Sequence, residues 1–378
     1  MVPGSIPSII LSGFDRSMYF YNITTLMKLS RNTKIFINYV LGPLLFLWLS
    51  YSLYQQIKNQ KGLKEAWEQM QQISISQLLI YLSIVLFLMV LNWTIEALKW
   101  QRVLRNVQRI SLTKAFKAIL SGVSFSATTP NRVGEYAGRV LFLDEGNRLR
   151  SVSLTIVCSM SQLIITLLMG FLGFIFLGNK AVGFLQGYSV WKDILLFALP
   201  IGSLILLLLY FKISHLTRML ERFSWVAKYR YLIVEMEKTG NKVLLQLLLL
   251  SLVRYAVFCV QYFLLFHLFG VSIDFWQSWA TVSATFLVLA IIPTIAIAEL
   301  GLRGTIIWEL MKPFTANSLG VTIATVAIWF INLIIPAIAG SILIAGVIHR
   351  VKVVEMRCAS ILPPLYLMHP VCFHDKNR

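Results

Sequence analysis

The sequence predicts an all-α fold, a polytopic helical membrane protein built from two inverted repeats, and three observations carry this prediction. Hydrophobic residues make up 57% of the 378-residue chain, and charged residues make up only 13%. Several apolar runs exceed the ~18 residues that a membrane-crossing helix needs. The two halves of the chain also repeat one order of apolar and polar segments. We therefore expect a membrane domain over 35–350, between a partly disordered cytoplasmic segment (1–34) and a cytoplasmic tail (351–378).

Six apolar segments are predicted to cross the membrane, three in repeat 1 (35–178) and three in repeat 2 (193–348). In chain order, the predicted spans are 35–57, 77–98, 152–178, 193–213, 243–269 and 319–348. Each half also has a more polar, broken segment between its second and third spans, at 112–139 and at 276–311. The first of these begins with 112–127, which is too short and too polar for a span, so we expect it to be re-entrant or interfacial.

The net charge of +18 is explained by the distribution of Lys and Arg along the chain. With the N-terminus inside and both broken segments non-crossing, 26 of the 34 Lys and Arg residues lie on the cytoplasmic side and 7 on the external side. This positive-inside pattern predicts a multi-pass protein of the cell membrane with both termini in the cytoplasm. It also favours anionic membrane lipids as partners over nucleic acid, because no RNA- or DNA-binding motif is visible.

Both broken segments carry a proline, a short gap, and then Glu-x-x-x-Arg with a glycine between the two charges. The two copies consist of Pro130, Glu135, Gly138 and Arg139, and of Pro293, Glu299, Gly301 and Arg303. The prolines are 163 residues apart, and the glutamates and the arginines are each 164 residues apart. Since each half has three spans, the second copy enters from the opposite side of the membrane. Secondary transporters use this plan and place the substrate between the broken helices of the two halves.

The charged residues of the two motifs are the leading candidates for a site. An ionised side chain deep in a bilayer costs about 2.5–3.5 kcal/mol on insertion scales, so Glu299 and Arg303 need a partner or water. They either pair with each other along one helical turn or line a polar cavity, with Glu135 and Arg139 opposite them.

The motif prolines and arginines also suit an anionic ligand. Pro130 and Pro293 are each expected in the first turn of a half-helix, whose free N–H groups and positive dipole end attract anions. Arg132 and Arg139 add bidentate donors for phosphate, which fits a phospholipid headgroup or a polyprenyl phosphate. The alternative for Arg132 is that its side chain lies in water in a loop, or that its charge serves only to set the orientation of the protein in the membrane.

Two further charges lie near the predicted cytoplasmic ends of spans. Glu96, with Trp93 and Trp100 beside it, is interpreted as part of an interfacial aromatic belt, with its carboxylate reaching water. Lys99 begins the basic cytoplasmic segment that follows. Arg254 occupies the corresponding place in the second half, and we expect it to be paired or to reach the interface.

No residue pattern predicts catalysis, a metal site or a cofactor. The four cysteines have no spacing typical of a disulfide framework. His369, Cys372 and His374 are close in sequence, but they lie in a polar tail, and we do not expect them to bind a metal. No Ser/His/Asp arrangement and no nucleotide-binding glycine pattern is present.

The segments TTPNRVGEYAGRV (128–140) and IIPTIAIAELGLRG (291–304), with the Trp93–Trp100 segment upstream, resemble the transmembrane region of lysylphosphatidylglycerol synthases, a flippase-like membrane family. The resemblance covers about 35–350. The substrate-binding positions that it implies are Pro130, Arg132, Gly134, Glu135, Arg139, Pro293, Glu299, Gly301 and Arg303. The second motif departs from the glycine-rich form of the family at Ile295–Ala298, which leaves the identity of the lipid open.

In the synthases, a separate soluble domain transfers an amino acid from tRNA to the lipid, and the membrane region is associated with moving the product across the bilayer. Only 349–378 follow the last predicted span, so we expect no such domain and no synthase activity. The leading hypothesis is a flippase-like transporter of an anionic lipid or lipid-linked amphiphile, working by alternating access. The alternatives are a membrane-embedded enzyme or transferase subunit acting on a phospholipid or polyprenyl-phosphate-linked substrate, and a structural scaffold.

Overall fold

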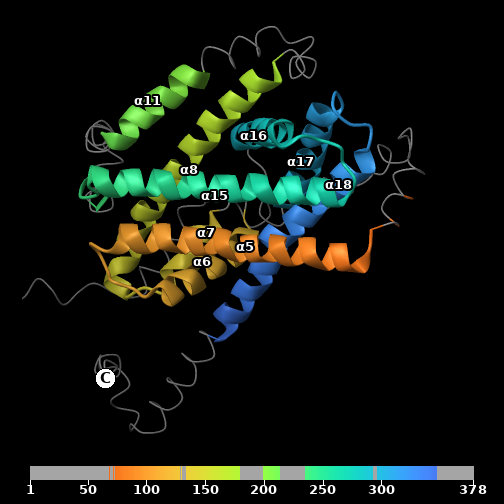
Figure 1. Ribbon diagram of the computed structural model, residues 1–378. Coiled ribbons are helices and arrows are strands. Elements are labelled where there is room, and N and C mark those ends of the chain that lie inside the picture. The colour runs from red at the N-terminus through yellow and green to blue at the C-terminus, as the bar shows by residue number, and fades with distance from the viewer. Residues whose placement is uncertain are drawn as a thin grey trace, which may run out of the picture. The chain divides into compact units, whose positions relative to one another are not determined.

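A computed structural model describes residues 68, 71, 73–127, 129, 133–178, 199–212, 235–292 and 296–346. The described residues form helices and connecting turns and include no strand (Figure 1). All of them belong to one compact unit, Leu49–Arg378. The all-α prediction is therefore confirmed. The first predicted span, 35–57, and the two terminal segments lie outside the described residues.

The helices of the described chain carry the labels of Figure 1. In chain order they are α5 (Ile75–Leu104), α6 (Leu112–Ala127), α7 (Gly134–Val140), the 3₁₀ turn η3 (Glu145–Asn147), α8 (Arg148–Leu177), α11 (Leu199–Phe211), α15 (Asn241–Leu268), α16 (Phe275–Ile291), α17 (Ala296–Met311), α18 (Ser318–Trp329) and the π-helical turn η6 (Phe330–Ile334).

Four helical stretches of the described chain are long and apolar enough to cross a membrane. They are Ile75–Leu104, Glu145–Leu177, Asn241–Leu268 and Ser318–Gly346. They match the predicted spans 77–98, 152–178, 243–269 and 319–348, so these four predictions are confirmed by length and composition. The predicted span 193–213 is described only over α11, which has 13 residues, and it stays a prediction.

Both polar segments are broken into two short helices, as the sequence predicts. The first consists of α6 and α7, with 16 and 7 residues, and the second of α16 and α17, with 17 and 16 residues. Helix α16 ends at Ile291, two positions before Pro293 in the sequence. A proline disfavours the helical conformation in the preceding residue, and Ile292 accordingly has φ −92° and ψ 112°.

The long helices α5 and α15 lie side by side and run in opposite directions (Figure 1). Near the end of α5, Arg102 Nη1 donates to Gln246 Oε1 of α15 at 2.8 Å. Near its beginning, the backbone oxygen of Val85 accepts from Gln261 Nε2 at 3.0 Å. Since α5 and α15 are the second spans of the two predicted halves, an inverted repeat requires this antiparallel packing. The complete two-half arrangement stays a prediction.

Glycines allow three close helix crossings. A side chain on Gly173 of α8 would press on the carbonyl oxygen of Ala280 in α16, and one on Gly340 would overlap the carbonyl oxygen of Leu120 in α6. Gly173 and Gly340 are 167 residues apart, close to the repeat offset. Gly138 of α7 lies against Ser121 and Gly122 of α6 in the same way. Small residues at such crossings are typical of membrane helices, because they let backbones approach closely.

Substitution of Gly138 by alanine is expected to destabilise the protein by about 1–3 kcal/mol through overpacking. Gly202 of α11 is a matched control, because nothing lies within 4 Å of a Cβ placed there. At Gly202, alanine is expected to stabilise the helix by about 0.5–1 kcal/mol. Thermal unfolding of the two variants in detergent measures the difference. Equal melting temperatures would show that the α6–α7 crossing tolerates a methyl group.

Candidate functional site

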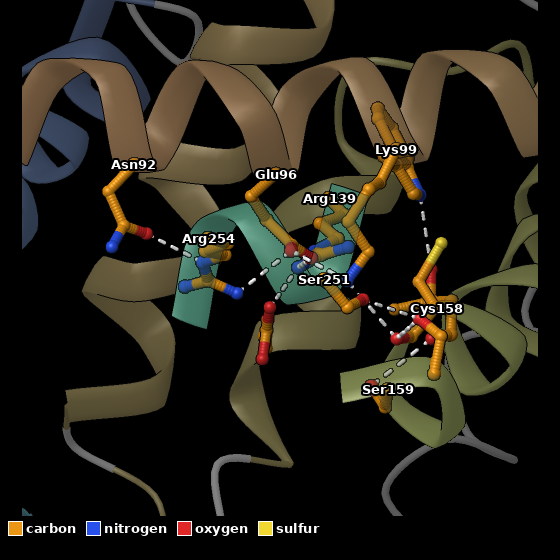
Figure 2. A network of polar contacts seen from close by, with 12 residues as sticks. Asn92, Glu96, Lys99, Arg139, Cys158, Ser159, Ser251 and Arg254 are labelled. Atoms are coloured by element: carbon orange, nitrogen blue, oxygen red, sulfur yellow. Dashed lines mark hydrogen bonds and ion pairs between the residues drawn. The ribbon is translucent and has the colours of Figure 1, made fainter. Parts of the chain in front are cut away.

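Glu96 of α5 is the centre of a buried network of charges (Figure 2). Its Oε1 accepts from Arg139 Nη2 of α7 at 3.0 Å. Its Oε2 accepts from Arg254 Nη1 of α15 at 2.8 Å and from Lys99 Nζ at 3.2 Å. The residue is only 4% exposed. The interfacial interpretation of Glu96 is therefore wrong, because three cations inside the protein surround its carboxylate.

Lys99 is also placed differently from its prediction. The sequence predicts that it begins a cytoplasmic basic segment, but α5 continues to Leu104 and buries the side chain completely. Its ammonium group donates to Glu96 and, at 3.3 Å, to the backbone oxygen of Cys158 in α8. Lys99 thus links α5 to α8 within the network. It is not a solvent-exposed cytoplasmic charge whose role is to set the orientation of the protein in the membrane.

Arg254 is paired, in agreement with one of the two outcomes expected for it. Besides its ion pair with Glu96, its Nε donates to Asn92 Oδ1 at 2.6 Å. Its guanidinium carbon lies 5.0 Å from the ring centre of Trp93. Figure 2 shows Asn92, Glu96 and Lys99 approaching the network from one helix. These residues are spaced i, i+4 and i+7, which places them on one face of α5.

The first motif helix, α7, presents Arg139 to this network. Glu135 and Arg139 form an ion pair one helical turn apart. Gly134 and Gly138 are buried against α6, so the charged face of this short helix is directed toward α5. Burial lowers the pKa of the Arg139 guanidinium, but the carboxylates of Glu135 and Glu96 outweigh burial and raise that pKa above its ordinary value. Arg139 therefore remains a cation at physiological pH.

The second motif has the same geometry, except that its arginine contacts a tyrosine on the long helix where the arginine of the first motif contacts a glutamate. Glu299 and Arg303 of α17 form an ion pair one turn apart, and Gly301 between them is buried. Arg303 Nη1 also donates to the hydroxyl of Tyr262 in α15 at 3.1 Å. Tyr262 is 166 residues after Glu96, so the two motif arginines contact equivalent positions on the two long helices. A carboxylate occupies that position in the first half and a phenol in the second.

Several buried donors remain without a hydrogen-bond partner among the described residues. They are Arg139 Nε and Nη1, Arg303 Nε, Asn92 Nδ2 and Trp93 Nε1. Leaving a buried donor unsatisfied costs about 1–3 kcal/mol, and more for a charged group. The two motif arginines therefore have buried donor groups that no described residue satisfies.

The other predicted site residues are only partly placed. Pro130, Arg132 and Pro293 lie outside the described residues. Helix α7 begins at Gly134 with Val133 as its N-cap, and the expected role of the two prolines in half-helix first turns stays a prediction. The two Glu–Arg pairs do form along one turn each, which was one of the two expected outcomes for Glu299 and Arg303. A common polar cavity between the pairs stays a prediction.

Sequence reasoning missed Asn92, Lys99 and Tyr262. The i, i+4, i+7 spacing of polar residues in an apolar helix was the available signal for Asn92 and Lys99. The repeat offset, applied to Glu96, would have found Tyr262. Within the part of the chain that the structure describes, no group of three His, Cys, Asp or Glu side chains is arranged to hold a metal ion.

Fold and site together define a multi-pass helical membrane protein with a buried, charged centre. The family model described as lysylphosphatidylglycerol synthase TM region matches residues 35–352, so the chain belongs to that family. The resemblance found in the two motifs is thus confirmed, and the protein is an integral membrane protein related to lipid handling. Neither the curated proteins nor the solved structures gave a match to the chain.

Proposed function

We propose that this protein is a flippase-like transporter that moves an anionic lipid or lipid-linked amphiphile by alternating access of its two halves. The observation that carries the proposal is the pair of equivalent arginines. Each is held in a broken segment by a glutamate one turn away and by a long helix, and each keeps buried donors that are unused among the described residues. Broken helices at such positions form the substrate sites of secondary transporters.

The charge balance of the first cluster favours an anion. Its described members are three cations (Lys99, Arg139 and Arg254) and two carboxylates (Glu96 and Glu135). One positive charge is therefore left uncompensated within this group. A phosphate group would supply the missing negative charge, and the planar guanidinium of arginine can bind it with two parallel hydrogen bonds.

The contacts between α5 and α15 are compatible with two halves that move against each other. Where the two helices meet, ion pairs and hydrogen bonds connect them at three levels, through Arg102, Glu96 and Val85 of α5. Polar contacts of this kind can be exchanged for others when one half rocks against the other. We place the protein in the cell membrane with both termini cytoplasmic, as the positive-inside pattern of the sequence predicts.

The test is lipid movement in vesicles of phosphatidylcholine and phosphatidylglycerol that contain the purified protein. Fluorescent phosphatidylglycerol in the inner leaflet becomes accessible to an external quencher when it is moved outward. We expect wild-type protein to accelerate this step. The variants Glu135→Gln and Glu299→Gln should slow it by about ten-fold or more, which corresponds to about 1.4 kcal/mol, because the motif arginines lose the partners that position them.

Glu309→Gln is the matched control, because Glu309 pairs with Lys312 in a more exposed position on the same helix as Glu299. It should move lipid at the wild-type rate. The proposal is wrong if wild-type protein neither binds nor moves phosphatidylglycerol or a polyprenyl phosphate. A change in headgroup composition of the vesicle lipid would instead indicate an enzyme.

A further inference from the structure

Helix α15 carries a stripe of three side chains that connects the two arginine clusters. Arg254, Phe258 and Tyr262 are spaced four residues apart, so they lie on one face of the helix. Arg254 belongs to the cluster around Glu96, and Tyr262 binds Arg303. The eight residues from Arg254 to Tyr262 correspond to about 12 Å along the helix axis.

Aromatic rings fill the interval between the two clusters. The guanidinium carbon of Arg254 lies 5.8 Å from the ring centre of Phe258. The Phe258 ring packs edge to face on Phe286 of α16, with the ring centres 6.0 Å apart. Phe286 in turn contacts Tyr262 at 5.9 Å and lies under the guanidinium of Arg303 at 5.5 Å. The order is thus arginine, phenylalanine, phenylalanine, arginine.

The two ends of this row and its middle differ in what they offer to an anion. Arg303, at one end, has a buried Nε donor that lacks a partner among the described side chains, and Arg139, which shares Glu96 with Arg254 at the other end, has two such donors, Nε and Nη1. Arg139 is 1% exposed and Arg303 is 9% exposed. In the middle, the two phenylalanine side chains have no hydrogen-bonding group. Apolar side chains at the narrowest point of a passage oppose the movement of water and hydrated ions.

Resting on the transport function proposed above, we propose that the anionic headgroup occupies two successive binding stations. The first station is Arg139 with Arg254, and the second is Arg303. Phe258 and Phe286 form an apolar partition between them. Each ring of the partition is held by a cation–π contact to a station arginine, and such contacts contribute about 0.5–2 kcal/mol. When the anionic headgroup attracts the arginine of one station, the cation–π contact of that arginine weakens and the phenylalanine ring beside it can move. The headgroup can then pass to the next station.

The partition is tested with the double variant Phe258→Ala/Phe286→Ala in vesicles that contain a chloride-sensitive dye. Without the rings, the row becomes a polar path lined by the arginines. We expect chloride flux to rise by about ten-fold or more over wild type, with chloride favoured over potassium. Phe286→Gln keeps much of the side-chain volume but adds a polar group, so we expect this variant to conduct chloride as well. It replaces the double variant in the experiment if the double variant does not fold.

Two controls separate the partition from general damage. Phe258→Leu/Phe286→Leu keeps the apolar bulk and should stay as tight as wild type. Phe266→Ala removes a buried ring from the same helix that packs on Tyr262, with the ring centres 5.7 Å apart, and is not part of the partition, so it should lower the melting temperature without a leak.

The two proposals fail separately. If wild-type protein moves no lipid but the alanine and glutamine variants conduct chloride, the partition stands and lipid transport is wrong. If wild-type protein moves phosphatidylglycerol while the folded alanine and glutamine variants remain tight to chloride, the partition is wrong and lipid transport stands. A leak in the leucine or Phe266 variants equal to that of the alanine variant also overturns the partition.

Discussion

Replacing Glu96 by leucine is expected to destabilise the folded protein by about 3–5 kcal/mol, the cost of removing one partner from a buried ion pair. Glu96 accepts from Lys99, Arg139 and Arg254, and both of its oxygens are engaged. Leucine is similar in size, so little packing is lost. The cost arises because three buried or largely buried cations lose the carboxylate they share, and desolvated charges of one sign then face each other.

Thermal unfolding in detergent measures this effect, with Glu309→Leu as the control. The ion pair of Glu309 with Lys312 is partly exposed, and such pairs contribute about 0–1 kcal/mol. Adding Arg254→Leu to Glu96→Leu should recover part of the lost stability, because it removes one of the stranded cations. Purely additive losses in the double variant would show that Glu96 and Arg254 are not coupled.

The membrane class and the motif pairs could be predicted because each depends on local sequence. Apolar length alone defines a span, and Glu-x-x-x-Arg on a helix brings the two charges onto one face whatever the tertiary structure. The short segment 112–127 and the broken segment 276–311 could likewise be predicted from their length, their polarity and the prolines in or after them. These features need no knowledge of which helix packs against which.

The network around Glu96 could not be predicted, because it depends on the packing of α5 against α7, α8 and α15. A carboxylate between two tryptophans near the end of an apolar run is typical of an interface, and only tertiary contacts distinguish that case from a buried centre. For a related reason, the sequence predicts that Lys99 begins a basic cytoplasmic segment and not that it lies in the helix. The neutralising contact of its ammonium group with Glu96 lets α5 continue as a helix to Leu104, where hydropathy alone would end it.

The difference between Glu96 and Tyr262 makes the two halves electrostatically unequal. Both residues bind a motif arginine from the equivalent position of a long helix. In the first half, the carboxylate also contacts two further cations, Lys99 and Arg254, whereas the phenol of the second half carries no charge at neutral pH. Among the described residues, the first station thus combines three cations with two carboxylates, and the second station contains Arg303 and the carboxylate of Glu299.

Changing Tyr262 to glutamate is therefore expected to stop lipid movement, whereas Tyr262→Phe should leave the rate within a few-fold of wild type. The new carboxylate would give Arg303 a second anionic partner beside Glu299 and make the net charge of the second station more negative by one. Two like charges about 4 Å apart repel each other by about 4 kcal/mol at an effective dielectric constant of about 20. An anionic headgroup at this station would thus be disfavoured by about a hundred-fold or more.

Tyr262→Phe separates two effects of the glutamate variant, because it removes the hydroxyl group of Tyr262 but adds no negative charge. It removes the acceptor of Arg303 Nη1 and should cost about 1–3 kcal/mol of stability, without adding a charge. The vesicle assay with fluorescent phosphatidylglycerol compares the two variants, and melting temperatures show that both are folded. Normal lipid movement by folded Tyr262→Glu protein would mean that the charge of the second motif does not control the substrate. Equal loss in both variants would mean that the hydroxyl, through its hold on Arg303, is what transport requires.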